Sequence, residues 1–554
     1  MVKHLANEDK KNPKTIDYQC FRISSCDLGR IQTCNLLSRN QVHYSVMLRG
    51  LCKGCKYNLI IFYAKEFLFK FKKLKFVCKQ YVLAMKIEQI YTKCLAQGAY
   101  YIESNGEAAI IDPLREPQPY IERAQKSGAQ IKFIFETHIH ADFVSGHVDL
   151  AKKTGATIVF GPNTKTTFDC YNAADYEEFK IGNITIKVLH TPGHTLESVT
   201  YLLIDENGRN HAIFTGDTLF LGDVGRPDLA IKSDLTEKDL AGMLFESLRS
   251  KIMTLDDDVI VYPAHGAGSA CGKNLSKETV GTIGDQKKTN YALRSEMTKE
   301  EFVKEVLDGI SPPPQYFAKN ALLNKTGYSD LDKVLASGDT PLSVDLFQEL
   351  AENKNTLILD VRTQQEFVKN YIPGSIFIGL NGGFAPWVGA LIEDITQPLL
   401  LVVPEGKSEE AVTRLARVGY DNTLGYLEGG IEAWISAGKA TDQIESIDAN
   451  EFEKLTKNKP LNVLDVRKDG EYLSMHLEGD HVQHFALDYI NEKMEQIDTS
   501  KTYHIHCAGG YRSVIAASIL KRQGHHNVVD ITGGFAALKK TNLKMSNYVC
   551  PSTL

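Results

Sequence analysis

The sequence predicts an α/β protein built from several domains, and three observations support this prediction. The chain has 554 residues, 43% of them hydrophobic, which is well beyond the length at which one core stops growing. Short β-rich runs alternate with helical runs between residues 85 and about 293. Further along, LDVRTQQEF (359–367) is repeated as LDVRKDGEY (464–472), an offset of 105 residues. We therefore expect two copies of one α/β unit, at residues 340–440 and 445–545.

The first α/β region, residues 85–293, places histidine or aspartate at the ends of its apolar runs. Loops at the carboxyl ends of strands converge on one site in open α/β sheets, so we expect these side chains to meet. The runs are IKFIFETHIH (131–140), IKVLHTPGH (186–194), HAIFTGD (211–217) and DVIVYPAHG (258–266).

Residues 294–339 are predicted to be a linker between this region and the repeats. A charged helical stretch at 298–307 is followed by Ser311-Pro312-Pro313-Pro314. Consecutive prolines stiffen a chain and stop a helix, which is typical of a spacer between domains.

Residues 1–84 differ in composition from the rest of the chain. They hold 16 basic and 5 acidic residues and six of the 11 cysteines, whereas the remainder holds 47 basic and 64 acidic residues. This segment has no sustained hydrophobic period, so we expect an extension, disordered or without an evolved role, before a working protein that starts at Met85. A basic arm with its own function is the alternative. Cys52 and Cys55 lack a second pair at zinc-finger spacing, which argues against zinc there.

The composition also indicates which binding partners and which cellular compartment to expect. The acidic body argues against nucleic-acid binding. The apolar stretch 59–77 is interrupted by five lysines and Glu66, so neither a membrane span nor a signal peptide is predicted. The sparse cysteines after residue 84 fit a reducing compartment, and we expect a cytoplasmic protein.

Histidines and aspartates in a fixed order predict a metal site within residues 85–293. His138 and His140, separated by one residue after a strand, can converge on one metal from the following loop. Asp142 follows them directly. The later members of the series stand in TPGH, TGD and PAHG, and they are His194, Asp217 and His265.

This order closely resembles the metallo-β-lactamase superfamily, whose motif H-x-H-x-D-H is followed by His, Asp and His. The resemblance covers about residues 85–293 and implies an αβ/βα sandwich. The sixth motif position, a histidine of the second metal site in the family, is Phe143 here. A phenylalanine cannot ligate, so the second site used by the binuclear hydrolases is expected to be empty.

The persulfide dioxygenases of the superfamily bind one iron through two histidines and one aspartate. By position, the resemblance implies that these ligands are His138, His194 and Asp217. Two imidazoles and a carboxylate also form the facial triad of non-haem Fe(II) oxygenases, which leaves coordination positions open. We expect one Fe(II) per chain. Zinc is the alternative, because the spacing of the motif does not separate the two metals.

The remaining polar residues of the region receive supporting roles from the resemblance. His140, Asp142 and His265 would orient the ligands or contact substrate, or else form the second metal site. Arg226, in GDVGRPDL, stands where family members place an arginine near the substrate, and its guanidinium could bind a carboxylate or sulfinate. A structural ion pair between Arg226 and Asp228 is the alternative.

The last repeat carries a cysteine loop. The apolar run YHIH (503–506) leads into Cys507-Ala-Gly-Gly-Tyr-Arg512-Ser, and a helical run follows. The glycines let backbone N–H groups turn toward the sulfur, and the helix N-terminus adds positive potential, which favours the reactive thiolate. Four residues separate Cys507 from Arg512, whereas phosphatases of this loop type use five. The shorter loop resembles that of rhodanese, with Cys507 as nucleophile and Arg512 beside it.

The first repeat lacks this chemistry. The offset of 105 places Val402 opposite Cys507 and Lys407 opposite Arg512, with Pro404 and Glu405 in place of both glycines. Because the fold markers Asp360, Arg362 and Gly429-Gly430 persist, this repeat is expected to be an inactive spacer or docking module.

The whole arrangement resembles bacterial fusions of a persulfide dioxygenase with sulfurtransferase domains. It implies that a low-molecular-weight thiol persulfide, such as that of glutathione or coenzyme A, is oxidised with O₂ at the iron to sulfite. Cys507 then transfers sulfane sulfur to sulfite and gives thiosulfate, which would serve sulfide detoxification. The alternatives are a zinc-dependent thioester hydrolase of the glyoxalase II type with a sulfurtransferase tail, and a non-enzymatic persulfide sensor. The sequence leaves open which thiol carries the persulfide, and a homo-oligomer is possible.

Overall fold

The computed structural model describes residues 37–38, 41–42, 85–229, 235–310 and 312–550. Two compact units divide the chain, Met1–Leu83 and Ala84–Leu554. In the first unit the described residues form a short antiparallel pair, β1 (Leu37–Ser38) and β2 (Gln41–Val42). Our predictions for residues 1–84, including those for Cys52 and Cys55, otherwise lie outside the described residues.

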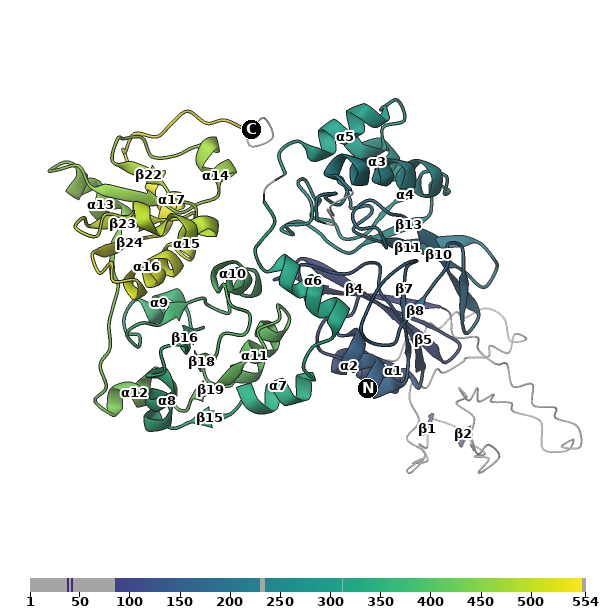
Figure 1. The fold of residues 1–554 in the computed structure, drawn as a ribbon, viewed down its shortest axis with the longest axis horizontal. Helices are drawn as coiled ribbons and strands as arrows, with labels where there is room; N and C mark the ends of the chain where they lie inside the picture. The colour runs from purple at the N-terminus through teal and green to yellow at the C-terminus, as the bar shows by residue number, and fades with distance from the viewer. Residues whose placement is uncertain (1–36, 39–40, 43–84, 230–234, 311, 551–554) are drawn as a thin grey trace, which may run out of the picture. The chain divides into compact units, whose positions relative to one another are not determined.

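The second unit begins with a sandwich of two six-stranded sheets (Figure 1). The first sheet has its strands in chain order: β3 (Lys86–Thr92), β4 (Gln97–Ser104), β5 (Glu107–Ile111), β6 (Gln130–Phe135), β7 (Thr157–Phe160) and β8 (Tyr171–Asn172). The second sheet has the order β14-β13-β12-β11-β10-β9, with β9 (Glu178–Ile181), β10 (Ile184–His190), β11 (Val199–Ile204), β12 (Asn210–Gly216), β13 (Ile260–Pro263) and β14 (Gly281–Thr282).

Helices cover the outer faces of both sheets (Figure 1). One face carries α1 (Gln118–Ser127) and α2 (His147–Thr154). The other carries α3 (Glu237–Ser247), which continues into a π-helical turn (Leu248–Ile252), and α4 (Ile283–Thr289). The α/β prediction and the sandwich are confirmed.

Alternation along the strands explains this layering. On β12, Ala212 and Phe214 belong to the core between the sheets, whereas Ile213 packs with Leu244 and Leu248 from the helical layer. Side chains of a strand point to opposite faces in turn, so a continuous apolar run is buried on both sides. The loops that follow these strands are therefore anchored in two cores rather than one.

Residues 294–339, predicted to be a linker, contain three packed helices. They are α5 (Lys299–Leu307), α6 (Phe317–Thr326) and α7 (Leu331–Gly338). A capping box between Thr298 and Glu301 starts α5, and Phe302 packs edge-on against Phe245 of α3, with ring centroids 5.4 Å apart. Helix α5 therefore extends the sandwich domain.

Each of the two repeats forms a five-stranded parallel sheet with the same strand order, β15-β19-β18-β16-β17 and β20-β24-β23-β21-β22. The first copy consists of β15 (Pro341–Leu342), α8 (Val344–Ala351), β16 (Leu357–Asp360), α9 (Gln364–Phe367), β17 (Ile376–Phe377), α10 (Phe384–Leu391), β18 (Leu399–Val402), α11 (Ser408–Ala416), β19 (Thr423–Leu427) and α12 (Gly430–Ser436). The second consists of β20 (Glu445–Asp448), α13 (Ala449–Thr456), β21 (Asn462–Asp465), α14 (Asp469–Ser474), β22 (Val482–His484), α15 (Ile490–Lys493), β23 (Tyr503–His506), α16 (Arg512–Arg522), β24 (Val528–Thr532) and α17 (Gly534–Leu538), with 3-10 turns at Leu487–Tyr489 and Met494–Gln496.

Contacts between the sandwich and the first copy lie beside the predicted metal loop. The backbone N–H of Val144 donates to the carbonyl of Arg417 at 2.8 Å. Arg115, fully buried, pairs with Asp421 of the first copy at 3.1 Å. Asn324 of α6 donates to the carbonyls of His140 and Phe143, both at 2.8 Å. The loop after β6 is thus held by the first copy and by α6, and Arg115 joins the loop after β5 to the first copy.

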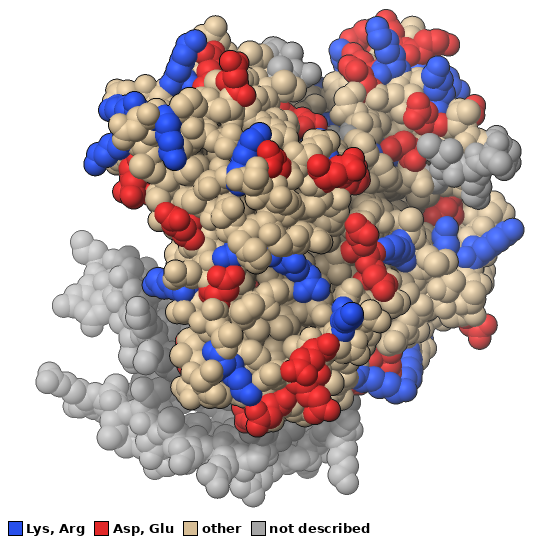
Figure 2. Space-filling view, turned by 60° about the vertical axis from the view of Figure 1, so that its left-hand side comes forward, with Lys and Arg blue, Asp and Glu red and all other residues tan. Residues whose placement is uncertain are grey.

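The surface carries charges of both signs. On the face shown in Figure 2, lysine and arginine side chains are intermingled with aspartate and glutamate. Among the described residues, no helix is both long enough and apolar enough to cross a membrane.

Candidate metal centre and cysteine loop

The predicted metal residues lie in loops that follow strands of the sandwich. His138, His140 and Asp142 follow β6, His194 follows β10, Asp217 follows β12 and His265 follows β13. All six side chains are buried. Strands from two different sheets therefore deliver the residues to one edge of the sandwich.

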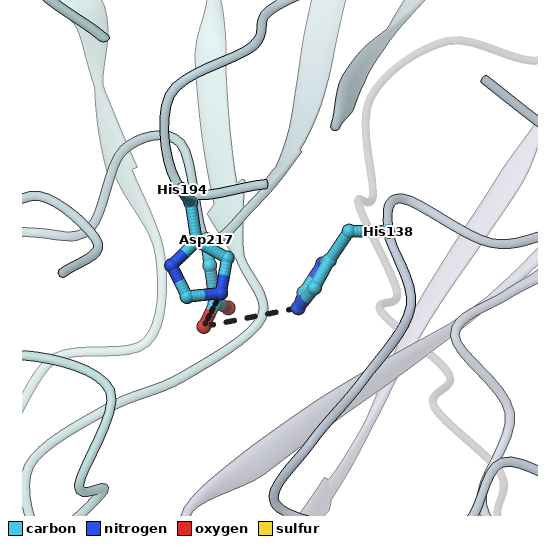
Figure 3. Close-up of side chains that lie close together, drawn as sticks. All are labelled: His138, His194 and Asp217. Atoms are coloured by element: carbon cyan, nitrogen blue, oxygen red, sulfur yellow. Dashed lines mark ion pairs between the residues drawn. The ribbon is translucent and has the colours of Figure 1, made fainter. Parts of the chain in front are cut away.

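His138, His194 and Asp217 form one cluster (Figure 3). Oδ2 of Asp217 lies 3.5 Å from Nε2 of His194 and 4.0 Å from Nε2 of His138. Within the described part of the chain, Nε2 of His138 and both carboxylate oxygens of Asp217 have no hydrogen-bond partner. Buried polar atoms without partners are costly, and a cation between them would satisfy all of them at once. The donor set therefore fits a metal ion.

Hydrogen bonds at the far side of the two rings set their orientation. Nδ1 of His194 lies 2.8 Å from the carbonyl oxygen of Arg226, and Nδ1 of His138 lies 3.0 Å from Oγ1 of Thr137. The Thr137 hydroxyl donates in turn to Asp112 at 2.8 Å. Such partners hold the rings so that Nε2 faces the metal position. Asp112 has no motif around it and was not predicted as a site residue.

His140 faces a second buried group of acids. Its Nε2 lies 3.1 Å from Asp112 and 3.3 Å from Glu136. Burial alone would lower the pKa of His140, but these carboxylates outweigh it and hold that pKa well above its usual value. His140 therefore interacts with Asp112 and Glu136 and is not a member of the first cluster. Glu136 was not predicted as a site residue either.

Asp142 and His265 lie together on the other side of Asp217. Nε2 of His265 is 3.3 Å from Oδ2 of Asp142 and 3.5 Å from Oδ1 of Asp217. Phe143 is fully buried, with its ring 4.4 Å from that of His140. Oδ2 of Asp217 therefore faces His138 and His194, and its Oδ1 faces His265.

The Arg226 guanidinium forms the ion pair that the sequence left as an alternative. Its Nε and Nη2 each donate to Asp228 at 2.7 Å, and Nη1 donates to the carbonyl of Ala270 at 3.3 Å. Its backbone carbonyl faces His194, as described above. These contacts hold the loops around the cluster in place, and substrate binding by Arg226 remains a prediction.

The cysteine loop joins β23 to α16. The N–H of Gly510 donates to Sγ of Cys507 at 3.1 Å, and the Ser513 hydroxyl lies 3.7 Å from the same sulfur. Gly510 has φ +98, a conformation that side chains disfavour and glycine accepts. Arg512 forms two hydrogen bonds with Glu471, at 2.6 and 2.8 Å. The loop thus presents backbone and hydroxyl groups to one buried sulfur.

Strand pairing corrects the alignment of the two repeats. Asp360 pairs with Val402 in the first copy, and Asp465 pairs with His506 in the second. Val403 therefore stands opposite Cys507, Ser408 opposite Arg512 and Gly406 opposite Gly510. The predicted pairings of Val402 with Cys507 and Lys407 with Arg512 are wrong by one residue, because the offset is 105 at Asp360 and Asp465 but 104 at this strand.

The corrected alignment leaves the first copy without a nucleophile. Val403 has no thiol, and Ser408 has no guanidinium. Gly406 keeps the left-handed conformation, with φ +69, so one glycine of the loop persists and only the other is replaced, by Glu405.

Comparison with known proteins identifies the families of these domains. The metallo-beta-lactamase superfamily model matches residues 93–168, and the rhodanese-like domain model matches residues 343–437 and 448–541. The chain belongs to the metallo-beta-lactamase superfamily and carries two rhodanese-like domains at its C-terminal side.

Several relatives share the first domain. The cytoplasmic hydroxyacylglutathione hydrolase of Arabidopsis thaliana is 35% identical over 33% of this chain and 67% of its own length. A probable hydroxyacylglutathione hydrolase of Schizosaccharomyces pombe is 31% identical over 33% of this chain and 75% of its own length. A crystal structure of a metallo-beta-lactamase from Staphylococcus aureus is 34% identical, with a TM-score of 0.55, and covers 62% of this chain and 98% of its own.

Proposed function

We propose that the chain oxidises a low-molecular-weight thiol persulfide to sulfite and then transfers sulfane sulfur to sulfite, giving thiosulfate. The observation that carries this proposal is the presence, in one chain, of a buried cluster of two histidines and one aspartate and of a cysteine loop sized for sulfur. Both sites would act on sulfur, and their fusion raises the effective concentration of sulfite at the second site.

His138, His194 and Asp217 would hold the metal, for which we propose a single Fe(II). When bound, such an ion supplies open coordination positions for a persulfide sulfur and for O₂. The residues around it keep the three ligands in place: Thr137 and the Arg226 carbonyl orient the rings, and burial excludes bulk water. Overall, one persulfide, one O₂ and one water give the thiol and sulfite.

Sulfur transfer would take place at Cys507. The thiolate attacks the outer sulfur of a second persulfide, the S–S bond breaks, and the thiol leaves with the proton. The sulfur atom of sulfite then attacks the outer sulfur held on Cys507, forming thiosulfate and releasing the thiolate. Gly510 N–H, which already donates to Sγ, stabilises the negative charge at both stages.

A zinc-dependent thioester hydrolase is the second candidate, because relatives at 35% and 31% identity carry the name hydroxyacylglutathione hydrolase. In the binuclear members of the superfamily a histidine stands at the position of Phe143, and its absence disfavours this candidate.

Measurements on the two reactions test the proposal. Full-length protein loaded separately with Fe(II) and with zinc is given glutathione persulfide, coenzyme A persulfide or a hydroxyacylglutathione thioester. We expect O₂ uptake with a persulfide from the iron form, and sulfite as product. Thioester hydrolysis by the zinc form, without persulfide-dependent O₂ uptake by the iron form, would establish the second candidate instead.

A further inference from the structure

Tyr511, in the cysteine loop of the second copy, is bound by the first copy. Its hydroxyl donates to the carbonyl oxygen of Gly379 at 2.7 Å, and its ring meets that of Phe377 edge to face, with centroids 5.7 Å apart. Burial raises the pKa of Tyr511, so the phenol keeps its proton and remains a donor. One residue of the loop that contains Cys507 is therefore anchored outside its own domain.

The pocket that receives the Tyr511 ring depends on a glycine. A Cβ atom at Gly382 would lie 2.6 Å from both Cε atoms of Tyr511, which is closer than real Cβ contacts. The neighbouring Gly383 differs, since a Cβ atom there would lie 3.4 Å from Cδ1 of Trp387, an ordinary contact. The surface of the first copy therefore fits the tyrosine ring at Gly382.

The segment of the first copy that contacts Tyr511 is itself held in place. Nη1 of Arg414, at the end of α11, donates to the carbonyl of Leu380 at 2.7 Å. The N–H of Leu380 donates to the carbonyl of Val361, which follows β16, at 3.0 Å. Hydrogen bonds from two directions thus fix the chain next to the acceptor of the Tyr511 hydroxyl.

The helix that follows the cysteine loop also contacts the first copy. Oγ of Ser518 accepts from the N–H of Phe377 at 3.0 Å, and Nη1 of Arg522 donates to the carbonyl of Gly374 at 2.6 Å. Tyr511 precedes α16 directly, and the three residues are seven and four positions apart, which places them on one side of the helix. The contact between the copies therefore continues from the loop along α16.

The two halves of the cysteine loop are held by different partners. The carbonyl of Cys507 accepts from the N–H of Phe535 at 2.7 Å, within the second copy. Two glycines follow shortly after, and glycine restricts the backbone least. Beyond them the ion pair of Arg512 and the contacts of Tyr511 hold the chain. The N–H that donates to the sulfur belongs to Gly510, directly before Tyr511.

The equivalent position in the first copy has a different residue. The corrected alignment places Lys407 opposite Tyr511. The Lys407 side chain is 53% exposed and pairs with Glu410 of its own domain at 2.9 Å. The rhodanese-like fold thus does not itself require an aromatic residue at this position, and the tyrosine stands in the copy whose loop meets another domain.

We propose that Tyr511 is a positioning residue for sulfur transfer, held in place by Gly379 and Gly382 of the first copy. Anchoring Tyr511 fixes the peptide before it, so that the N–H of Gly510 points at Sγ of Cys507 and stabilises the thiolate that forms when sulfur leaves. The first copy is then part of the sulfur-transfer site. This inference rests on the sulfur-transfer half of the proposed function and does not concern the metal.

Alanine at two neighbouring glycines tests the inference in the full-length protein. Gly382→Ala should displace the Tyr511 ring, whereas Gly383→Ala, the matched control, should not. The rate at which iodoacetamide alkylates Cys507 is followed by mass spectrometry as a function of pH. We expect the midpoint of this profile to rise in Gly382→Ala, because a weaker hydrogen bond to sulfur favours the thiolate less. Gly383→Ala should keep the wild-type profile.

Sulfur transfer from glutathione persulfide to sulfite is the second readout. Gly382→Ala should lower kcat by up to about 10²-fold, the cost of misplacing a reacting group by about 1 Å, and leave KM for the persulfide unchanged. Tyr511→Phe, which removes the hydroxyl alone, should change both readouts in the same direction by less. In a Tyr511→Ala background, Gly382→Ala should cause no further loss, because the ring that it displaces is absent.

Circular dichroism checks that each variant is folded, and the Tyr511 variants decide the question if Gly382→Ala is not. Wild-type alkylation profiles and kcat in Tyr511→Phe and Tyr511→Ala would overturn the inference. So would a loss from Gly382→Ala that is equally large with and without the Tyr511 ring. If the wild type transfers no sulfur to sulfite, the proposed function fails, whereas the alkylation profiles still report whether Tyr511 positions the loop.

Discussion

The two rhodanese-like copies have the same strand order and different surroundings. In the second copy, β23 ends at a buried cysteine that accepts a hydrogen bond from Gly510. In the first copy the equivalent strand β18 leads to Val403, and the following helix α11 ends beside the metal loop, where the Arg417 carbonyl binds Val144. One copy has the cysteine loop, and the other contacts the metal domain. A rhodanese-like fold without the cysteine thus still provides a packing surface for the neighbouring domain.

Removing the sulfur of Cys507 should have the largest effect. We expect Cys507→Ser to lower sulfur transfer to sulfite about 10³-fold or more, because a hydroxyl neither accepts sulfane sulfur nor leaves as readily as a thiolate. Persulfide-dependent O₂ uptake should persist, with sulfite accumulating in place of thiosulfate. Chromatography of both products checks this, and continued thiosulfate formation would assign the transfer to another residue.

Asn324 tests whether the packing beside the first copy supports the metal loop. Asn324→Leu removes hydrogen bonds to His140, Phe143 and Ser145 and leaves their backbone groups buried. We expect a loss of about 3 kcal/mol in the free energy of unfolding, together with weaker metal binding. Denaturant unfolding and metal titration measure both.

Asn320 supplies the matched control on the same helix. It is equally buried, but neither of its amide atoms has a hydrogen-bond partner among the described residues. Asn320→Leu should therefore leave stability unchanged or raise it. If both variants lose the same free energy of unfolding, the change in side-chain volume on α6 determines stability, and the hydrogen bonds of Asn324 do not.

Asp530 should make the stability of the second copy depend on pH in a way that the first copy does not share. It lies in β24 next to the cysteine strand, where burial raises its pKa to about 6, although a hydrogen bond with Ser513 lowers it in part. By strand pairing, Tyr426 takes this position in the first copy. Because the folded pKa lies above the unfolded value, stability from this group is complete below about pH 4 and is lost as pH rises through about 6.

We therefore expect Asp530→Asn to be more stable than the wild type by about 2 kcal/mol at pH 7, with the difference vanishing near pH 4. Thermal unfolding across this range gives the result. A difference that is constant with pH would show that Asp530 does not titrate in the folded protein.

Restoring a cysteine to the first copy should have the smallest effect. Val403→Cys places a thiol at the position equivalent to Cys507, but Glu405 and Ser408 replace a glycine and the arginine of the active loop. A nearby carboxylate opposes a thiolate, so in a Cys507→Ser background we expect no recovery of sulfur transfer. Recovery would mean that the fold alone is sufficient for the chemistry.

Several parts of the site were predictable because they are local in sequence. The motif from His138 to Asp142 lies in the loop after β6, and the residues from Cys507 to Arg512 lie in the loop from β23 to α16, so their closeness in space followed from their closeness in sequence. The alternation of buried residues along strands such as β12 likewise follows from the pleat. The α/β fold was predicted from the alternating runs, the two copies from the internal repeat, and the sandwich from the resemblance to the metallo-β-lactamase superfamily.

Other parts depend on residues that are distant in sequence. Asp112, Glu136 and Cys271 stand in no recognisable pattern, and only strand packing brings them to the histidines. The alignment error at Val402 arose because offsets of 105 occur on both sides of the cysteine strand, so the sequence does not locate the compensating indels.

The sequence by itself determined which chemical groups this protein has: histidines and aspartates after strands, a cysteine loop in the second copy, and a first copy without it. The tertiary structure decided which of those groups share a site. It placed Cys271 beside His265, brought Asp112 and Glu136 to His140, and packed the first copy against the metal loop. The physical reason is that covalent spacing specifies neighbours only within a few residues, whereas contacts across sheets depend on how buried surfaces pack.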